Sequence, residues 1–247
     1  MARYAMVIDQ ERCVGCQSCT VACKSEWDVP NGFARTRVRQ AGVTGSFPKL
    51  SSAFYVSQCN HCDRPTCVPA CPTGATYQDG NGIVRVDREL CIGCGACVAA
   101  CPYGARYVSP TLGKVDKCDF CASRLEKSLD PACVATCPAH AKIFGNLEDT
   151  SSDVFRIVYR EGARRLESGD VAIGPNVYYR GKAEHADMLL ASFPPQLPRT
   201  IAAGKVWSKV VNKLVYLAVG ATFLGQAVAF FRQLGAGEKQ FEDQEIV

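Results

Sequence analysis

The sequence lacks the short motifs by which many enzymes bind a nucleotide or activate a substrate. Its 247 residues contain no G-x-G-x-x-G run after a strand signal and no Walker A loop, so dinucleotide or nucleotide binding of those kinds is not predicted. No pattern pairs a nucleophile with a neighbouring general base. We therefore expect any substrate chemistry to reside on another protein.

A strong charge of one sign is also missing. The formal net charge is +4 and charged residues make up 21% of the chain, an ordinary globular balance that does not indicate nucleic-acid binding. No secretory signal is predicted either, because residues 1–9 are too short and too soon interrupted by charge, and this N-terminal stretch has no twin-arginine pair. We expect the chain either to stay in the cytoplasm or to be exported folded, attached to a partner that carries the signal.

Cysteine, in contrast, is abundant, with sixteen residues. The stretch Cys91–Pro102 reads C-x2-C-x2-C-x3-C-P, the run by which bacterial ferredoxins hold [4Fe–4S] clusters. Three cysteines on one tight loop can wrap three corners of a cubane. The fourth lies about one helical turn further on, faces away, and reaches a second cluster. A run of this form predicts a partner run elsewhere in the chain.

Three further groups of four cysteines have related spacings. Cys13–Cys23 repeats C-x2-C-x2-C-x3-C, with Lys24 in place of the proline. Cys59–Cys71 is spaced C-x2-C-x4-C-x3-C, and Cys118–Cys137 has eleven residues in its middle gap. Four groups within residues 13–137 amount to an internal repeat, which indicates two ferredoxin-like units with two clusters each.

Disulfide bonds and zinc are the alternatives for so many cysteines. Disulfide scaffolds are usually short secreted chains, and they do not require cysteines in fours. Structural zinc sites typically use two C-x2-C pairs separated by a longer loop, whereas these runs place more thiolates close together. We therefore favour iron–sulfur clusters. The small residues Gly15, Gly93 and Gly95 would let backbone amides approach cluster sulfurs and tune the reduction potential.

The stretches between the cysteine groups predict short strands at Tyr4–Asp9, Phe54–Val56 and Ile83–Asp87, the last in a hairpin. Residues 25–50 are rich in glycine, proline, arginine and polar side chains, so we expect a loop there.

After the third group, residues 123–129 predict a helical turn and residues 154–167 a helix. Residues 171–179 are consistent with either a strand or a docking arm. Three prolines at positions 194, 195 and 198 indicate a linker.

Residues 214–231 form an uncharged run of eighteen residues between Lys213 and Arg232. As a helix rising about 1.5 Å per residue, this run would span roughly 27 Å, close to the thickness of a bilayer core. We therefore expect a transmembrane helix. A buried or amphipathic helix is the alternative, because the run is at the short end of spanning segments.

Two kinds of polar residue near the cysteines also need a role. His61 stands in the sequence Cys-Asn-His-Cys, but all four positions of its group are already cysteine, so we expect it to act structurally or beside a cluster. For the basic residues around the fourth group we expect a solvated face, with screening of cluster charge or docking of an acidic partner as the alternative. These residues are Lys114, Lys117, Arg124 and Lys127.

Together these motifs resemble a known family, the four-cluster electron-transfer (beta) subunits of complex iron–sulfur molybdoenzymes. Members include the polysulfide, dimethyl sulfoxide and tetrathionate reductases and the membrane formate dehydrogenases. The resemblance rests on the segments Tyr4–Cys16, Cys59–Cys62, Lys117–Cys121 and Cys137–Asp149. Residues 221–239 instead resemble the C-terminal anchor helix of formate dehydrogenase beta subunits.

The resemblance implies which cysteines share a cluster, since in this family the first group pairs with the fourth and the second with the third. We name the four implied ligand sets A to D. Set A is Cys13, Cys16, Cys19 and Cys137; set B is Cys23, Cys118, Cys121 and Cys133; set C is Cys59, Cys62, Cys67 and Cys101; set D is Cys71, Cys91, Cys94 and Cys97. Four [4Fe–4S] clusters are expected, with these sixteen cysteines as the iron ligands.

The resemblance also implies a fold and a function. The expected fold class is α+β, with two interleaved ferredoxin-like units over residues 1–150. Residues 151–205 would form a docking extension and linker, residues 206–234 a transmembrane anchor helix, and residues 235–247 a polar tail. The chain would relay electrons in anaerobic-type respiration, without catalysis of its own. Its partners would be a large molybdopterin catalytic subunit and an integral membrane subunit that handles quinone, of the cytochrome b or polysulfide-reductase type.

Two other functions stay open. The chain could serve a membrane-bound nickel–iron hydrogenase, or act as a free four-cluster ferredoxin for soluble enzymes, although the uncharged C-terminal run disfavours the free form. For the cluster domain we expect the outer (periplasmic) face of a membrane, reached by export with the partner. The cytoplasmic face is the alternative, because three lysines precede the uncharged run while only Arg232 and Lys239 follow it.

Overall fold

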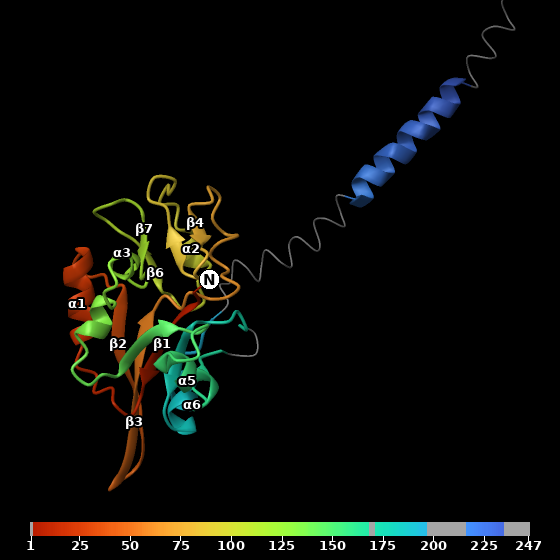
Figure 1. Ribbon diagram of the computed structural model, residues 1–247. Helices are drawn as coiled ribbons and strands as arrows, with labels where there is room; N and C mark the ends of the chain where they lie inside the picture. The colour runs from red at the N-terminus through yellow and green to blue at the C-terminus, as the bar shows by residue number, and fades with distance from the viewer. Residues whose placement is uncertain (1, 168–170, 197–215, 235–247) are drawn as a thin grey trace, which may run out of the picture. The chain divides into compact units, whose positions relative to one another are not determined.

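The computed structural model describes residues 2–167, 171–196 and 216–234. The chain divides into two compact units, Met1–Pro198 and Arg199–Val247. All sixteen cysteines belong to the first unit, which mixes short helices with small sheets (Figure 1). The predicted mixture of α and β elements is confirmed.

A four-stranded sheet in the order β8-β1-β10-β9 lies at the centre of the first unit. β1 (Tyr4–Asp9) runs antiparallel to β8 (Lys142–Asn146) and parallel to β10 (Val177–Arg180). β10 also pairs with β9 (Arg164–Arg165). The strand predicted at Tyr4–Asp9 is therefore confirmed, and the end of the segment 171–179 contributes a strand to the same sheet.

β1 is apolar from Tyr4 to Ile8 because both of its faces are buried. Met6 and Ile8 pack into one core cluster, and Ala5 and Val7 on the opposite face pack into another. Full burial of one aliphatic side chain contributes about 1.5–3 kcal/mol, so β1 is the main anchor for the segments around it.

The helix predicted over residues 154–167 is shorter in the structure. α5 (Asp153–Tyr159) begins after Ser152, whose hydroxyl accepts a hydrogen bond from the Phe155 N–H at 3.1 Å. It ends because the chain turns at Gly162, with φ of +73°, and continues into β9.

The loop predicted over residues 25–50 is wrong for most of its length. α1 (Ser18–Trp27) reaches into this segment, and β2 (Thr36–Ser46) pairs antiparallel with β3 (Lys49–Gln58). Figure 1 shows this ribbon extending away from the rest of the unit. The prediction failed because most of β2 is exposed on both faces, so its sequence lacks the apolar–polar alternation of a half-buried strand. The strand predicted at Phe54–Val56 lies within β3.

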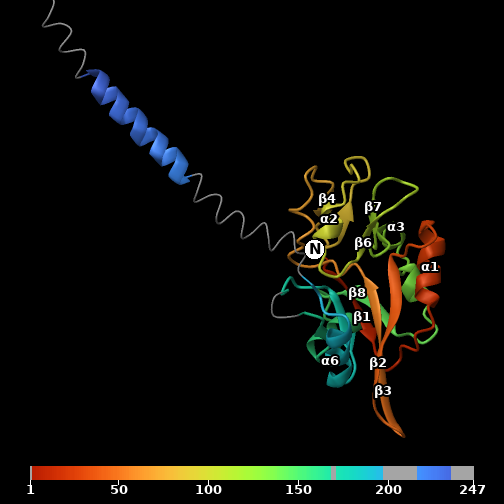
Figure 2. The ribbon, with the colours of Figure 1, turned by 180° about the vertical axis from the view of Figure 1, so that it is seen from behind.

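Two short hairpins complete the unit. β4 (Thr76–Gln78) pairs with β5 (Val84–Val86), which confirms the predicted hairpin, and β6 (Arg106–Val108) pairs with β7 (Val115–Lys117). α6 (Ala183–Ser192) lies against β2 and β3, as the reverse view shows (Figure 2). The remaining helices are α2 (Ala96–Ala99), α3 (Ala122–Leu125) and α4 (Ala132–Ala135). α3 covers only the first part of the helical turn predicted at residues 123–129.

The described part of the second unit is one helix, Tyr216–Leu234. It has 19 residues and a mean hydropathy of 1.2, so it is long and apolar enough to cross a membrane. The other parts of the predicted anchor and tail, residues 206–215 and 235–247, lie outside the described residues.

Candidate iron–sulfur site

The sixteen cysteines all lie in the described part of the chain, and all are free thiols, so none is held in a disulfide. Glycines with left-handed backbone shape the C-x2-C loops of the first and third cysteine groups. Gly15 has a φ of +69° and Gly93 one of +70°. A Cβ atom at Gly15 would overlap the ring of Phe54, and one at Gly93 would overlap the carbonyl oxygen of Gly113. These loops therefore require glycine for both conformation and space.

The thiols of set A gather at the start of α1. Burial raises the pKa of Cys13, a hydrogen bond from the Gly15 backbone opposes this rise, and the charges of Cys19, Cys137 and Cys16 add to it. Thiols that influence one another in this way are near neighbours, so the structure brings the first and fourth cysteine groups together.

Set B is wholly buried. Burial, and then the charges of Cys133 and Cys121, raise the pKa of Cys23 to about 12, while Arg35 lowers it. Cys118 has a pKa raised by burial first and by Cys23 and Cys133 next. Burial also raises the pKa of Cys121. Buried thiols that lie close together are unfavourable as isolated thiolates, whereas bound iron would stabilise them in that form.

The thiols of set C are likewise close to one another. Burial raises the pKa of Cys62, and the charges of Cys59, Cys101 and Cys67 raise it further. The structure thus brings the second cysteine group together with the last cysteine of the third.

Set D lies on more open loops. Cys71 accepts hydrogen bonds from Thr76 and Thr73, which outweigh its burial and lower its pKa to about 7. Cys91 accepts a hydrogen bond from the Val115 N–H at 3.5 Å, and Cys97 is buried on α2. The described residues show no direct thiol–thiol interaction within set D, and cluster ligation stays a prediction for all four sets.

Neighbouring sets meet in a single order. Cys133 of set B acts on the pKa of Cys19 in set A, after burial and Lys142. Cys59 of set C acts on Cys118 of set B. Cys67 of set C packs in one apolar cluster with the buried cysteine of α2 in set D. The resulting order is A–B–C–D.

Exposure of the thiols follows the same order. Each outer set has one exposed cysteine, Cys16 in set A and Cys94 in set D, whereas sets B and C have none. The two inner sets are thus shielded from water, and the two outer sets reach the surface.

A single metal ion does not fit this arrangement. A zinc site needs four ligands about 2.0–2.3 Å from one ion. Among the described residues, no three histidine, cysteine, aspartate or glutamate side chains converge closely enough to hold one ion. Thiols that are close without converging on one point fit the larger cluster instead.

Buried basic side chains accompany the thiols. Burial opposes the charge of Lys142, but Cys133, Cys19 and Cys118 outweigh it and raise the pKa of Lys142. Burial likewise opposes the charge of Arg106, and neighbouring thiolates, Cys67 foremost, raise its pKa. Each of these cations needs negative charge nearby, which thiolates and an iron–sulfur cluster supply.

Lys117 is a correction to the sequence analysis. We expected it on a solvated basic face, but it is 3% exposed, and its ammonium group donates to the backbone carbonyls of Val84 and Cys118. Lys117 ends strand β7, whose buried face turns its side chain inward. Lys127, in contrast, is exposed as expected.

Three buried nitrogens of the cysteine-bearing unit have no hydrogen-bond partner in the described residues, although one of them, in Arg35, lies 3.6 Å from an Asp119 oxygen. They are Nη1 of Arg35, Nε2 of His61 and Nε of Arg106. A buried N–H without an acceptor is costly, and cluster sulfides are acceptors. The donor set and its orphaned N–H groups therefore fit [4Fe–4S] clusters.

His61 has a structural role. It is fully buried, its Nδ1 accepts a hydrogen bond from the Val84 N–H at 3.0 Å, and its ring packs against Phe120 with centroids 3.8 Å apart. Burial, and then the nearby charges of Lys117 and Arg106, lower its pKa well below the usual value. His61 is thus a neutral ring that joins the Cys-Asn-His-Cys loop to β5.

A buried ion pair lies beside the thiols of set B. Arg35 binds Asp116 through Nε and Nη2 at 2.9 and 2.6 Å, and the Tyr107 hydroxyl donates to the same carboxylate. The Arg35 guanidinium lies 4.3 Å over the ring of Trp27, and the Trp27 indole N–H donates to Cys121 Sγ at 3.3 Å. Arg35 therefore differs from the other buried cations in having a carboxylate partner.

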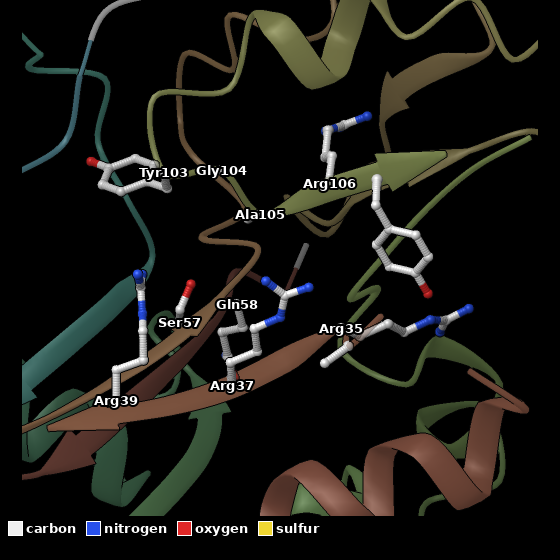
Figure 3. A pocket seen from close by; sticks show the side chains of 11 residues that line it. Arg35, Arg37, Arg39, Ser57, Gln58, Tyr103, Gly104, Ala105 and Arg106 are labelled. Atoms are coloured by element: carbon white, nitrogen blue, oxygen red, sulfur yellow. The ribbon is translucent and has the colours of Figure 1, made fainter. Parts of the chain in front are cut away.

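Arg35 and Arg106 also line a cavity of about 260 Å³ between β2 and the segment that leads into β6. Figure 3 shows Arg37 and Arg39 reaching from β2 toward the segment Tyr103–Ala105, while Arg106 and Arg35 point in other directions. The buried arginines are therefore directed at their own partners, the thiolate of Cys67 and Asp116, rather than into the cavity.

The sequence did not identify Lys142 and Arg106 as residues of the site. A single basic residue within a short apolar strand was the only available signal, as in Ala141-Lys142-Ile143-Phe144. That pattern does not reveal which side chain is buried, since a strand of this length can carry a lysine at its exposed edge.

Comparisons with known proteins agree with this site. The model of the 4Fe-4S dicluster domain matches residues 50–147, and that of the 4Fe-4S binding domain matches residues 4–25. The thiosulfate reductase electron transfer subunit of Salmonella typhi is 45% identical over 186 residues, which cover 73% of this chain and 97% of that protein. A tetrathionate reductase subunit of Salmonella typhimurium is 44% identical over 182 residues, 72% of each chain. Protein NrfC of Escherichia coli is 40% identical over 180 residues, 71% of this chain and 79% of its own. The cofactor is the [4Fe–4S] cluster, and sixteen cysteines in ferredoxin-like spacing correspond to four of them.

Proposed function

The chain belongs to the family of iron–sulfur electron-transfer subunits of reductases, and from this premise we propose that it is the electron relay of a membrane-bound molybdopterin reductase. The observation that carries the proposal is the order A–B–C–D, with an exposed thiol at each end and none in the middle. When bound, each cluster accepts and releases electrons. An ordered series with two accessible ends suits transfer between two partners.

The surface at each end of the series supports docking of partner subunits. Val14 is 64% exposed beside Cys16, and Ile92 is 66% exposed beside Cys94. Burial of exposed apolar side chains against a partner is energetically favourable. A partner subunit that covered these two side chains would also exclude water from the outer clusters.

The proposed partners are a large molybdopterin catalytic subunit and an integral membrane subunit that handles quinone, of the cytochrome b or polysulfide-reductase type. The two Salmonella relatives reported above are named as subunits of reductases, which gives the hydrogenase alternative no support. The helix Tyr216–Leu234 would anchor the chain, with the cluster domain on the outer (periplasmic) face. Within residues 1–150, sets A and B would form one ferredoxin-like unit and sets C and D the other. Residues 151–205 would form the docking extension and linker.

Substitution of Cys94 tests the relay. In the purified complex, Cys94→Ala should lose one cluster and block electron flow between the catalytic subunit and quinone, while the catalytic subunit still reacts with artificial dyes. Ile92→Ala is the matched control, because it changes the same loop without removing a ligand, and it should keep all four clusters. Unchanged quinone-linked activity in a Cys94→Ala complex that has lost its cluster would refute the relay.

Protease treatment of spheroplasts tests the location. We expect the cluster domain to be cleaved in intact spheroplasts, since it would face outward. Cleavage only after lysis would place the domain on the cytoplasmic face and leave the relay itself unaffected.

A further inference from the structure

We propose that three buried basic side chains, Lys142, Lys117 and Arg106, tune the relay, one at each junction between consecutive cysteine sets. Each would raise the reduction potential of the two clusters that it separates. This inference rests on the proposed function, and it adds positioning residues that are not themselves ligands.

Lys142 occupies the A–B junction. It extends from β8, is 4% exposed, and its Nζ donates to the neutral Gln58 Oε1 at 2.8 Å. The negative charges that act on it come from Cys19 of set A and from Cys133 and Cys118 of set B. Lys142 also lines a small cavity together with Cys13, Cys16, Cys19 and Cys137, the four thiols of set A. One ammonium group therefore faces thiols of both sets.

Lys117 occupies the B–C junction. Its Nζ donates to the carbonyl oxygen of Cys118, a member of set B, at 2.7 Å and to that of Val84. On the other side its charge acts on Cys67 of set C, where it counters part of the effect of burial. Lys117 thus stands between the two inner sets.

Arg106 occupies the C–D junction. Its Nη2 donates to Cys67 Sγ at 2.9 Å, and its Nη1 donates to Thr76 Oγ1 at 3.2 Å. The charges that act on it include Cys59 of set C and Cys97 of set D. Its remaining nitrogen, Nε, has no partner among the described residues and is free to donate to a cluster sulfide.

The counter-charge of these three cations comes from the clusters rather than from carboxylate side chains. Within the described ranges, none of the three cations forms an ion pair with a carboxylate, whereas the equally buried Arg35 binds Asp116. An unpaired buried cation is strongly unfavourable, so its counter-charge must be the thiolates and the cluster that they hold. Reduction adds one more negative charge to that cluster. A fixed cation in a poorly solvated interior stabilises the added charge and so raises the potential.

Redox titration of the full chain in its complex, followed by electron paramagnetic resonance, tests the proposal. Lys142→Gln, Lys117→Gln and Arg106→Gln each remove one charge. We expect each to shift two clusters downward by at least tenfold in the reduction equilibrium, about 59 mV for a one-electron couple. Lys142→Arg keeps the charge, and Lys127→Gln removes an exposed one, so both should stay near the wild-type potentials.

The pattern of shifts in reduction potential tests the proposal even before the electron paramagnetic resonance signals are assigned to individual clusters. Lys142→Gln and Arg106→Gln should shift two pairs of signals that do not overlap, and Lys117→Gln should shift one signal from each pair. Unchanged potentials in a variant with full iron content, or an equal shift of all four clusters, would overturn the proposal.

Iron content decides the case of a variant that does not load. Loss of clusters in Lys142→Gln but not in Lys142→Arg supports a requirement for the charge. Loss in both would mean that side-chain shape matters instead, which overturns the tuning role at that junction. These potentials are measured with mediators, so they are independent of the quinone-linked activity that tests the relay.

Discussion

Replacing Asp116 with leucine should leave a buried guanidinium without its hydrogen-bond acceptor, with an Asp119 oxygen 3.6 Å from Nη1 as the remaining carboxylate contact. The Arg35 and Asp116 side chains are only 3% and 8% exposed, and two hydrogen bonds of 2.9 and 2.6 Å join them. Solvent therefore does little to screen the pair. Asp116→Leu removes the acceptor of both bonds, together with the acceptor of the Tyr107 hydroxyl.

The size of the effect follows from burial. Breaking a buried ion pair by removing one partner costs about 3–5 kcal/mol, because the remaining charge stays desolvated. Removing both partners costs less, because the charges left behind, Asp119 and Arg88, are 25% and 51% exposed and remain solvated. The double variant Arg35→Leu/Asp116→Leu still loses the stacking of the guanidinium on Trp27, which is worth about 0.5–2 kcal/mol. The single variant should therefore be less stable than the double variant.

Loss of iron–sulfur absorbance in a fixed concentration of urea, without oxygen, provides the assay. Cluster loss is irreversible, so the measured quantity is a rate. If the pair is already broken in the transition state for unfolding, about 3 kcal/mol corresponds to a roughly 100-fold faster loss for Asp116→Leu. For the double variant, about 0.5–2 kcal/mol corresponds to an increase of roughly 2- to 30-fold.

Comparing the rates of cluster loss in the single and double variants shows whether the cost comes from an unpaired charge. Equal rates for the single and double variants would refute the reasoning, because the cost would then come from packing rather than from an unpaired charge. Tyr107→Phe is a further control, since it removes one hydrogen bond and leaves the ion pair intact.

Three further predictions concern the loops and the series of clusters. Gly93→Ala should lose the cluster of set D, because the added methyl group overlaps the Gly113 carbonyl at a φ of +70°, whereas Gly42→Ala, with open space around its Cα, should keep full iron content. His61→Leu should keep four clusters but lose about 1–3 kcal/mol of stability, because the Val84 N–H is left buried without an acceptor; selective loss of one cluster would instead make His61 a ligand. Brief exposure of the isolated chain to oxygen should bleach the clusters of the outer sets A and D before those of B and C, as followed by electron paramagnetic resonance, and simultaneous loss of all four would contradict the difference in burial.

Much of the site is predictable from the sequence because its determinants are local. The C-x2-C loops place their thiols within a few residues of one another, and glycine at Gly15 and Gly93 permits the turn. The strand at Tyr4–Asp9 is predictable for the same reason, since burial of both faces demands a continuous apolar run. The length and lack of charge of the run at residues 214–231 can likewise be read directly from the sequence, and most of this run lies in the helix Tyr216–Leu234.

The β2–β3 ribbon marks the limit of such reasoning. Its residues are mostly exposed on β2, and the pairing with β3 satisfies the backbone without an apolar face that a pattern could reveal. Strand β10 was similarly ambiguous, because its partner β1 is some 170 residues away in the chain and supplies the hydrogen bonds that make it a strand.

The sequence alone thus determined the cluster chemistry of this protein, because ligand type and spacing are properties of short segments. Only the tertiary structure decided the order A–B–C–D and the positions of Lys142, Lys117 and Arg106 between the sets. The cost of a buried charge depends on every group that surrounds it, and those groups come from strands and loops far apart in the chain. A lysine that looks solvated in the sequence can therefore lie between two groups of thiols in the fold.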